Sequence, residues 1–506
     1  MTHARRPRQQ WRTLRRILVT AVAASITAVL LMPGIGPPFT HSGPRLLPGY
    51  AAKIAGTFFA PKSVFALYFP PYPVSLDNLP PQSDYYATQY LQPNGESGKH
   101  AYCGGLLRDR PIPRSPRSGN WRLADLQDEV RTAKKFGLDG FTIDILTKSS
   151  NPEWVTQVPA LLLTAAHNVD PSFKIMLMPD MSGELASLTQ DELASDMMKL
   201  ASYPSAFRLG DGRLVLSPFL AEAHDAPWWS VFLNIMANQY KTPVAFVPQF
   251  LNSSPYIDSF TPFTYGMAEW GGRSPQFTPI SNTQDPDVQH IHNNGMLWMQ
   301  PVSVQDERPN QSIYDEAVNT TNLRATWMAT ISNQADWVQL NTWNDYSEGT
   351  SFAPSVKHGT AFLKASQYYM RKYKTGKQPA INGDLVVLTH RTQLTNAPTS
   401  FQESQPMVLR DGSGPVSDAV EALTFLAVPA DVTVTVGSNK RTCKVPAGVS
   451  VCTLPLAQPS AAGDSVSARV TRLIFGFPMT FASVTSPNKV IPLPYVQDLQ
   501  YVAAVN

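Results

Sequence analysis

Eight short apolar runs between residues 64 and 345 constrain the fold of this chain more than any other feature of its sequence. Most are continuous rather than alternating, which is typical of strands that are buried on both faces of a parallel sheet. Helical patterns lie between several of them, and the clearest, over 123–137, ends at Gly137. Strands that alternate with helices predict an α/β fold with a (β/α)8 TIM-type barrel. The runs are VFALYF (64–69), GFTIDI (140–145), KIMLMPD (174–180), RLVLSPF (213–219), PVAFVPQF (243–250), SFTPFTYG (259–266), MLWMQPVS (296–303) and DWVQLNTWND (336–345).

Two parts of the chain depart from this pattern. The fifth and sixth runs lie too close together for a full helix between them, so one of these two strand assignments conflicts with the barrel. From about residue 380 the helical periodicity ends, and β-branched runs recur at hairpin spacing. We therefore expect a catalytic barrel over 63–379 and a C-terminal antiparallel β-sandwich over 380–506.

The N-terminus reads as a targeting segment. Six arginines precede an apolar run over 17–32, and no clean cleavage site follows it. Residues 1–36 are therefore predicted to be either a signal peptide or a membrane anchor, with a linker over 37–62. We expect an exported protein, secreted or at the cell surface, that contacts a membrane only if this segment is retained.

Composition and motifs exclude several classes of function. The chain has 41 Lys+Arg against 38 Asp+Glu, and a net charge of +3 does not indicate a nucleic-acid binder. The sequence contains no HExxH metal-binding motif, Walker A motif, GxSxG motif or dinucleotide-binding motif. No metal, cofactor or protein partner is therefore predicted. Cys443 and Cys452 flank a short turn and could staple a hairpin by a disulfide, the alternative being two free thiols, and Cys103 is left over.

Candidate chemistry lies at the carboxyl ends of the predicted strands, where barrel enzymes place their active sites. In TWNDYSEGTS (342–351), Asp345 ends the eighth run and Glu348 follows three residues later. One carboxyl group could donate a proton to a leaving oxygen while the other activates water, and their separation would distinguish retention from inversion. The candidate substrate contacts are further carboxylates and aromatic or amide groups near the same rim, namely Asp144, Asp180, Glu269, Tyr68, Trp270, Trp343, Asn344 and Tyr346.

Several segments together resemble glycoside hydrolase family seventy-one, the α-1,3-glucanases or mutanases. TWNDYSEGT resembles the W-N-D-Y-x-E segment of that family, and HGTAFLKASQYYMRKYKTGKQP (358–379) resembles the helix and exit that follow. KKFGLDGFTIDI, Pro179-Asp180-Met181 and DGRLVLSPF resemble its second, third and fourth strands, so the resemblance covers about 63–380. It implies an endo-acting, inverting α-1,3-glucan hydrolase whose paired catalytic acids correspond to Asp345 and Glu348.

The chain also departs from the family pattern in ways that concern the substrate. Ser347 stands where the family often has Gly, and Asp144 stands where Asn is common. The YFPPY segment (68–72) is closer to related barrels that act on α-mannosides. Two alternatives therefore stay open: an α-mannoside or other α-glycoside hydrolase, and a non-catalytic cell-surface protein that binds glycans.

Overall fold

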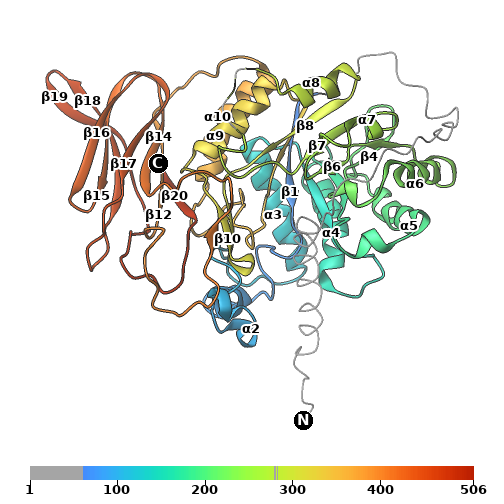
Figure 1. The fold of residues 1–506 in the computed structure, drawn as a ribbon, viewed down its shortest axis with the longest axis horizontal. Helices are drawn as coiled ribbons and strands as arrows, with labels where there is room; N and C mark the ends of the chain where they lie inside the picture. Colours follow the sequence, from blue (N-terminus) through green and yellow to red (C-terminus); the bar gives the residue numbers. More distant parts are fainter. Residues whose placement is uncertain (1–60, 279–280, 282) are drawn as a thin grey trace, which may run out of the picture.

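The computed structural model describes residues 61–278, 281 and 283–506, so the predicted N-terminal targeting segment lies outside the described residues. Within that range the chain forms a barrel followed by a body of antiparallel sheets, which lie side by side (Figure 1). No helix among these residues is both long and apolar enough to cross a bilayer.

The barrel is a parallel sheet that closes on itself. Its strand order is β5-β4-β3-β2-β1-β11-β8-β7-β6, and β5 and β6 are consecutive pieces of one segment, separated only by Val247 and Pro248. Because this segment pairs with β4 on one side and β7 on the other, eight chain segments complete the ring. The predicted barrel is confirmed. The strands are β1 (Ser63–Tyr68), β2 (Gly140–Ile145), β3 (Lys174–Pro179), β4 (Leu214–Leu216), β5 (Val244–Phe246), β6 (Gln249–Phe250), β7 (Gly266–Glu269), β8 (Leu297–Val302) and β11 (Trp337–Leu340).

A helix follows each segment of the ring and packs against it. The Asn120 side chain accepts a hydrogen bond from the Leu123 amide at the start of α3, and Gly137 ends that helix with φ +99°. A capping box of Thr189 and Glu192 begins α5. The helices are α3 (Trp121–Phe136), α4 (Val158–Val169), α5 (Gln190–Ala201), α6 (Ala226–Asn238), α7 (Ile257–Phe260), α8 (Pro286–Asn293), α9 (Thr321–Ser332) and α10 (Ala361–Thr375). The long loop after β1 carries three short elements, η1 (Tyr86–Tyr90), α2 (Gly95–Gly98) and η2 (Ala101–Cys103).

The sixth predicted strand is misplaced. Residues 259–263 of that run lie in α7 and the turn after it, because Ile257 and Phe260 are buried on one side of a single helical turn. The strand itself, β7, begins only at Gly266. The short gap between the fifth and sixth runs therefore came from reading part of the helix as strand.

The chain after residue 380 forms two four-stranded antiparallel sheets that face each other across an aliphatic core, as a sandwich requires. Cys443 and Cys452 form a disulfide that joins the two sheets, whereas the sequence suggested a staple within one hairpin. The first sheet is β17 (Gly448–Pro455), β14 (Ala419–Leu426), β12 (Leu385–Arg391) and β20 (Tyr501–Val505). The second is β16 (Asn439–Val445), β15 (Ala430–Val436), β18 (Val466–Ile474) and β19 (Phe477–Thr485).

The sandwich and the barrel are tied together by polar contacts and by a small shared sheet. That sheet joins β9 (Asp306–Arg308) and β10 (Ile313–Asp315), which follow β8, to β13 (Val408–Leu409) from the C-terminal part. The amides of Leu499 and Tyr501 donate to Glu307 and Gln305, at 2.7 and 2.8 Å. The loops of the barrel rim are thus held partly by residues from beyond the barrel.

Candidate active site

The segment after β11 is fixed by hydrogen bonds to both neighbouring strands. The Asn341 amide donates to the Val302 carbonyl at 2.9 Å, and the Trp343 amide donates to the Leu67 carbonyl at 2.6 Å. The Thr342 hydroxyl accepts from the Asp345 amide at 2.8 Å. This turn places Asp345 and Glu348 at the carboxyl end of the barrel, as their sequence position predicted.

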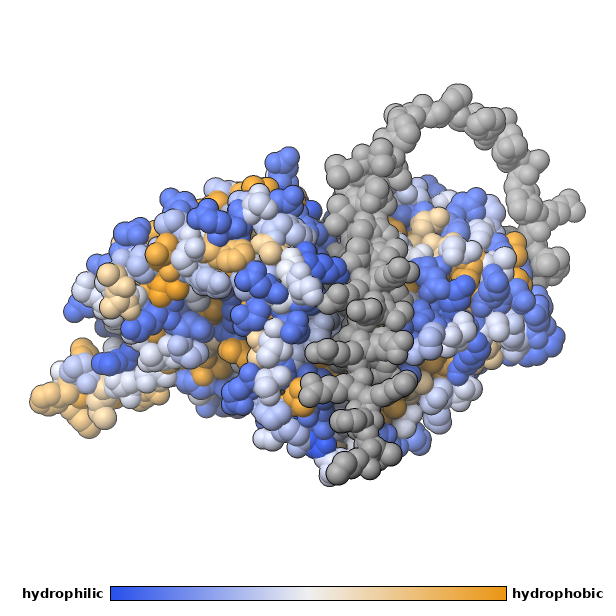
Figure 2. Space-filling model, turned by 90° about the horizontal axis from the view of Figure 1, so that it is seen from below, coloured by the Kyte–Doolittle hydropathy of each residue, from blue (hydrophilic) through white to orange (hydrophobic). Residues whose placement is uncertain are grey.

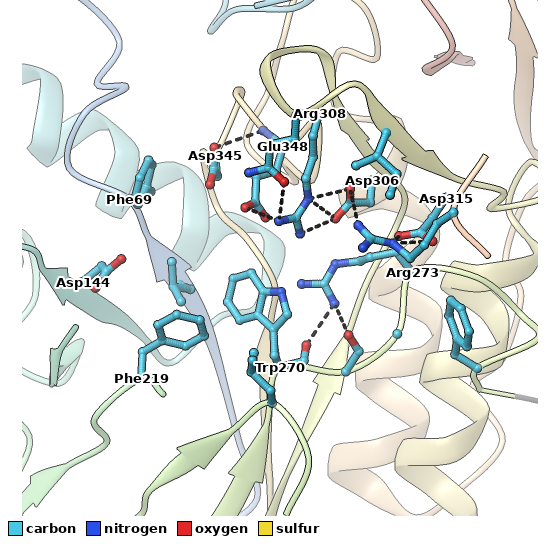
Figure 3. A pocket seen from close by; sticks show the side chains of 18 of the residues that line it. Phe69, Asp144, Phe219, Trp270, Arg273, Asp306, Arg308, Asp315, Asp345 and Glu348 are labelled. Atoms are coloured by element: carbon cyan, nitrogen blue, oxygen red, sulfur yellow. Dashed lines mark hydrogen bonds and ion pairs between the residues drawn. The ribbon is translucent and has the colours of Figure 1, made fainter. Parts of the chain in front are cut away.

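The two carboxyl groups have different hydrogen-bond partners (Figure 3). Asp345 Oδ1 accepts from the Ser347 amide at 2.9 Å, the Ser347 hydroxyl at 2.7 Å and the Glu348 amide at 3.2 Å. Glu348 Oε1 pairs with Arg308 Nη1 at 2.8 Å, whereas its buried Oε2 has no hydrogen-bond partner among the described residues. One oxygen of Glu348 is therefore held while the other is available to carry a proton.

Burial raises the pKa of both groups. The pKa of Asp345 rises to about 6, because desolvation outweighs its hydrogen bonds from Ser347 and the charge of Arg308. The pKa of Glu348 rises to about 8, because desolvation and the nearby charge of Asp345 outweigh the effect of Arg308. At neutral pH the pair therefore holds one proton, on Glu348.

Both groups line a cavity of about 540 Å³ that also contains Asp144 and Asp180. Asp144 lies in β2, Asp180 directly follows β3, and burial raises the pKa of each carboxyl group. The pKa of Asp144 is raised further by the charges of Asp180 and Asp345, and one of its buried oxygens has no partner in the described structure. Burial thus favours the protonated form of Asp144, which offers an O–H donor much as an Asn side chain offers N–H.

The side of the cavity away from Asp144 and Asp180 consists of ion pairs. Arg308 pairs with both Glu348 and Asp306, and Arg410 pairs with Asp315 at 3.0 Å. Arg410 follows β13, so the C-terminal part of the chain supplies one wall of the cavity. Figure 3 shows Arg308 between Glu348 and Asp306, with Trp270 and Arg273 below them.

Aromatic side chains give the cavity an apolar surface. Trp270, directly after β7, packs against Phe219 at 5.1 Å between ring centroids, and Phe69 lines the same space. The Arg273 guanidinium stands over the Trp270 ring at 4.7 Å. Rings beside carboxyl groups suit a sugar, because the apolar face of a pyranose can stack while its hydroxyls hydrogen-bond. Trp270 is thus placed where its predicted role requires.

Other predicted substrate contacts lie outside the cavity. Tyr68 and Trp343 are fully buried between the barrel and α3, where both donate to the carboxylate of Glu129 at 2.8 and 3.4 Å. The Asn344 side chain accepts a hydrogen bond from the Phe69 amide and donates to the carbonyls of Phe69 and Tyr72. These bonds join the last and first loops of the barrel. These side chains have no free face or polar atom for a sugar, so their expected role is corrected to a structural one.

Two further predicted substrate contacts, Tyr346 and Glu269, also lie outside the residues that line the cavity. Tyr346 is buried in a cluster of aromatic side chains under the first loop and does not line the cavity. Glu269 ends β7, but its carboxylate accepts from the amide and hydroxyl of Ser253 at 2.8 and 2.6 Å. Both residues were chosen from their position in the sequence, which gives the end of a strand but not the direction of the side chain.

Sequence reasoning missed Arg308, Arg273, Arg410 and Glu129. Arg273 and Arg410 lie in loops and Arg308 ends the three-residue strand β9, and no periodic pattern marks such residues. A signal for Glu129 was present, because it falls on the buried face of α3 with Leu126, Val130 and Ala133, at helical spacing. A carboxylate at such a position has to find buried hydrogen-bond donors.

Comparison with known proteins identifies the family of this chain. The sequence profile described as glycosyl hydrolase family 71 matches residues 116–472. The chain belongs to glycosyl hydrolase family 71. It is thus a glycosidase, and the resemblance seen in the sequence is confirmed.

Three curated relatives are similar at low identity. An ascus wall endo-1,3-alpha-glucanase of Schizosaccharomyces pombe is 25% identical over 47% of this chain and 55% of its own length. A glucan endo-1,3-alpha-glucosidase, agn1, of the same yeast is 24% identical over 66% of this chain and 82% of its own. A mutanase of Penicillium rubens is 25% identical over 65% and 75% of the two chains.

Among solved structures, a GH99 endo-alpha-mannosidase of Bacteroides thetaiotaomicron aligns with a TM-score of 0.48 at 14% identity. The alignment covers 62% of this family 71 chain and 98% of that chain.

Proposed function

We propose that this protein is an exported endo-hydrolase of α-1,3-glucan that uses Glu348 as general acid and Asp345 as general base. The observation that carries this assignment is the asymmetry of the pair. Glu348 Oε2 is unpartnered on a group whose pKa is about 8, whereas Asp345, with a pKa of about 6, is ionised at neutral pH. The choice of α-1,3-glucan rests on the family and on the names of its three relatives.

The proposed reaction is a single displacement at the anomeric carbon. Glu348 Oε2–H gives its proton to the glycosidic oxygen as the bond between that oxygen and the anomeric carbon breaks. A water molecule attacks from the opposite face, and Asp345 takes its proton as the new bond forms. The product then has the inverted anomeric configuration, and proton exchange with solvent returns the pair to its starting state.

Neutral sugar is the substrate class that suits the charge of the cavity. Six carboxyl groups and three arginines line it, and with Glu348 protonated the cavity has no excess of positive charge to attract a polysaccharide with carboxylate or sulfate groups. Trp270 and Phe69 would stack on the glucose rings, while Asp144 and Asp180 would bind hydroxyl groups.

A substrate panel with two variants tests this proposal. The chain should release reducing ends from α-1,3-glucan faster than from α-1,4-glucan, α-1,6-glucan or α-mannan, and NMR should detect β-anomers first. Asp345→Asn and Glu348→Gln should each lower kcat by at least about 100-fold, which is the low end for loss of a general acid or base. Thr375→Ala, at the end of α10, is a control that should leave kcat unchanged.

Faster hydrolysis of α-mannan than of α-1,3-glucan would contradict the proposed substrate but would still be consistent with glycoside hydrolysis. Retention of glucan without hydrolysis by the wild-type chain would instead favour a glycan-binding protein. Near-wild-type turnover in either carboxyl variant would remove that residue from the mechanism.

A further inference from the structure

The hairpin of β18 and β19 ends in a group of large apolar side chains that no other described part of the chain covers. This apolar tip consists of Leu473, Ile474, Phe475, Phe477, Met479 and Phe481, and Phe475 is 97% exposed, Phe477 73% and Leu473 68%. It forms the end of the molecule farthest from the barrel, and it protrudes in the space-filling view (Figures 1 and 2). Exposed groups of this kind mark interaction sites.

The tip is an ordered hairpin turn whose strands remain paired up to its last residues. Ile474 pairs with Phe477 across the hairpin, and Phe475 and Gly476 make the turn with φ of +53° and +85°. Positive φ at both central residues is the geometry of a tight two-residue hairpin, and Phe475 adopts it although it has a Cβ atom. At its base, Arg472 is held by Asp384 and stands over the Phe481 ring at 4.7 Å. The contacts of Arg472 therefore hold the base of the hairpin that carries the apolar residues.

The chemistry and size of the tip decide between possible partners. None of its six side chains carries a hydroxyl, amide or charged group, so it cannot hydrogen-bond the hydroxyls of a glycan. A stable protein interface uses roughly 20–30 residues on each side, several times more than this tip provides. A lipid bilayer needs neither polar groups nor a large area, because its interior takes up apolar side chains directly.

The sheet behind the tip is strongly basic. Strands β15, β16, β18 and β19 carry five Lys and Arg against one Asp, a net charge of +4 in a chain whose total is +3. By strand register, Lys440, Lys444 and Arg469 share the outer face, and Lys444 lies level with Thr471, just behind Leu473. Lys440 and Arg469 form no ion pair within the described part of the chain, and both are exposed. Lys444 and Arg469 lie nearer the tip than Lys440, which is level with Ser467, and basic groups just behind an inserted tip would meet lipid headgroups.

We propose that the apolar tip inserts into the surface of an anionic lipid bilayer, with the basic outer face of its sheet against the headgroups. This contact is separate from the membrane anchor considered for residues 1–36, and it is independent of the glycosidase reaction. It would hold the barrel beside a membrane while the cavity stays open to polysaccharide.

A fluorophore placed on the tip tests the proposal in the full chain. Phe475→Cys introduces the only accessible thiol in the described chain, because Cys103 is buried and Cys443 is bonded to Cys452. An environment-sensitive dye on that thiol should brighten and shift to the blue with vesicles of phosphatidylcholine and phosphatidylserine. The control is Thr375→Cys, exposed at the end of the barrel helix α10 and far from the tip, where the dye should not respond. Circular dichroism checks that both variants are folded.

The basic face is tested by the same readout. Adding Lys444→Gln or Arg469→Gln to the labelled chain should lower the partition coefficient about five-fold for each residue, since each cation near an anionic surface contributes about that factor. Vesicles of phosphatidylcholine alone should bind more weakly. An unchanged spectrum at residue 475 with both vesicles would overturn the proposal. A response to particulate α-1,3-glucan, or to protein concentration alone, would also overturn it in favour of a glycan or a second copy.

Discussion

At the scale of single residues, the roles of Asp345 and Glu348 are separated by what each oxygen contacts. Three hydrogen bonds hold Asp345 Oδ1, and Arg308 holds only one oxygen of Glu348. Arg308 lowers the pKa of both groups, against the larger effect of desolvation. It therefore sets the pH range in which one group is ionised and the other protonated.

The first prediction is a bell-shaped dependence of kcat on pH, with limbs near 6 and 8 that belong to the coupled pair. Activity should fall below about pH 6 as the base gains a proton, and above about pH 8 as the acid loses one. Arg308→Gln should move both limbs to higher pH, because it removes a charge that lowers both pKa values. Arg410→Gln, in the same cavity but paired with Asp315, is the control and should leave the limbs in place. A profile unchanged by Arg308→Gln would contradict this reading of the pair.

At the scale of elements, the sequence predicted the strands well because burial on both faces leaves a continuous apolar run. It also predicted that Asp144, Asp180, Asp345 and Glu348 would meet, because the carboxyl ends of parallel strands share one edge. It could not separate α7 from a strand, since one helical turn and a short strand bury the same few residues. Nor could it show that Tyr68 and Trp343 turn toward α3, because side-chain direction depends on barrel closure.

Helix α3 carries the second prediction. The pKa of Glu129 rises to about 8 by burial, well above its value in the unfolded chain. The folded state then binds a proton that the unfolded state releases, so this group's contribution to stability is present below about pH 4.5 and is lost as pH rises to about 8. Glu129→Gln keeps an acceptor for the Tyr68 hydroxyl and cannot ionise. The free energy of unfolding of this variant, relative to wild type, should therefore rise between pH 5 and pH 8.

Asp128→Asn is the matched control for this measurement, because Asp128 is the preceding residue of α3 and is exposed, with partners Arg117 and Arg131. Urea titrations at pH 5, 6.5 and 8 give the required differences. If the difference between Glu129→Gln and wild type did not change with pH, the buried carboxyl would not be protonated as described.

At the scale of the whole molecule, the barrel and the sandwich depend on each other through buried polar contacts. Arg391 of β12 pairs with Glu316 at 3.0 Å, and both side chains are fully buried. Removing one partner of such a pair leaves an uncompensated charge, which is costly. No sequence pattern indicates these contacts, because they join polar residues that lie far apart in the chain.

The disulfide between the sheets of the sandwich carries the third prediction. Cys443 and Cys452 are nine residues apart, and closing a loop of that length in the unfolded chain is worth about 2.5 kcal/mol. The double variant Cys443→Ser, Cys452→Ser should lose about that much free energy of unfolding. Cys103→Ser is the control for loss of a thiol, and a reductant should destabilise the wild type but not the double variant. Equal stability of the wild type with and without reductant would contradict the prediction.

The shared sheet of β9, β10 and β13 also has a consequence for when the enzyme becomes active. Arg410 lines the cavity from the end of β13, which pairs with β10, and the side chain of Glu307 accepts a hydrogen bond from the amide of Leu499. A growing chain that has produced the eight barrel segments still lacks these parts. We therefore expect hydrolysis to begin only when the segment around residue 500 has been synthesised and has folded back onto the rim.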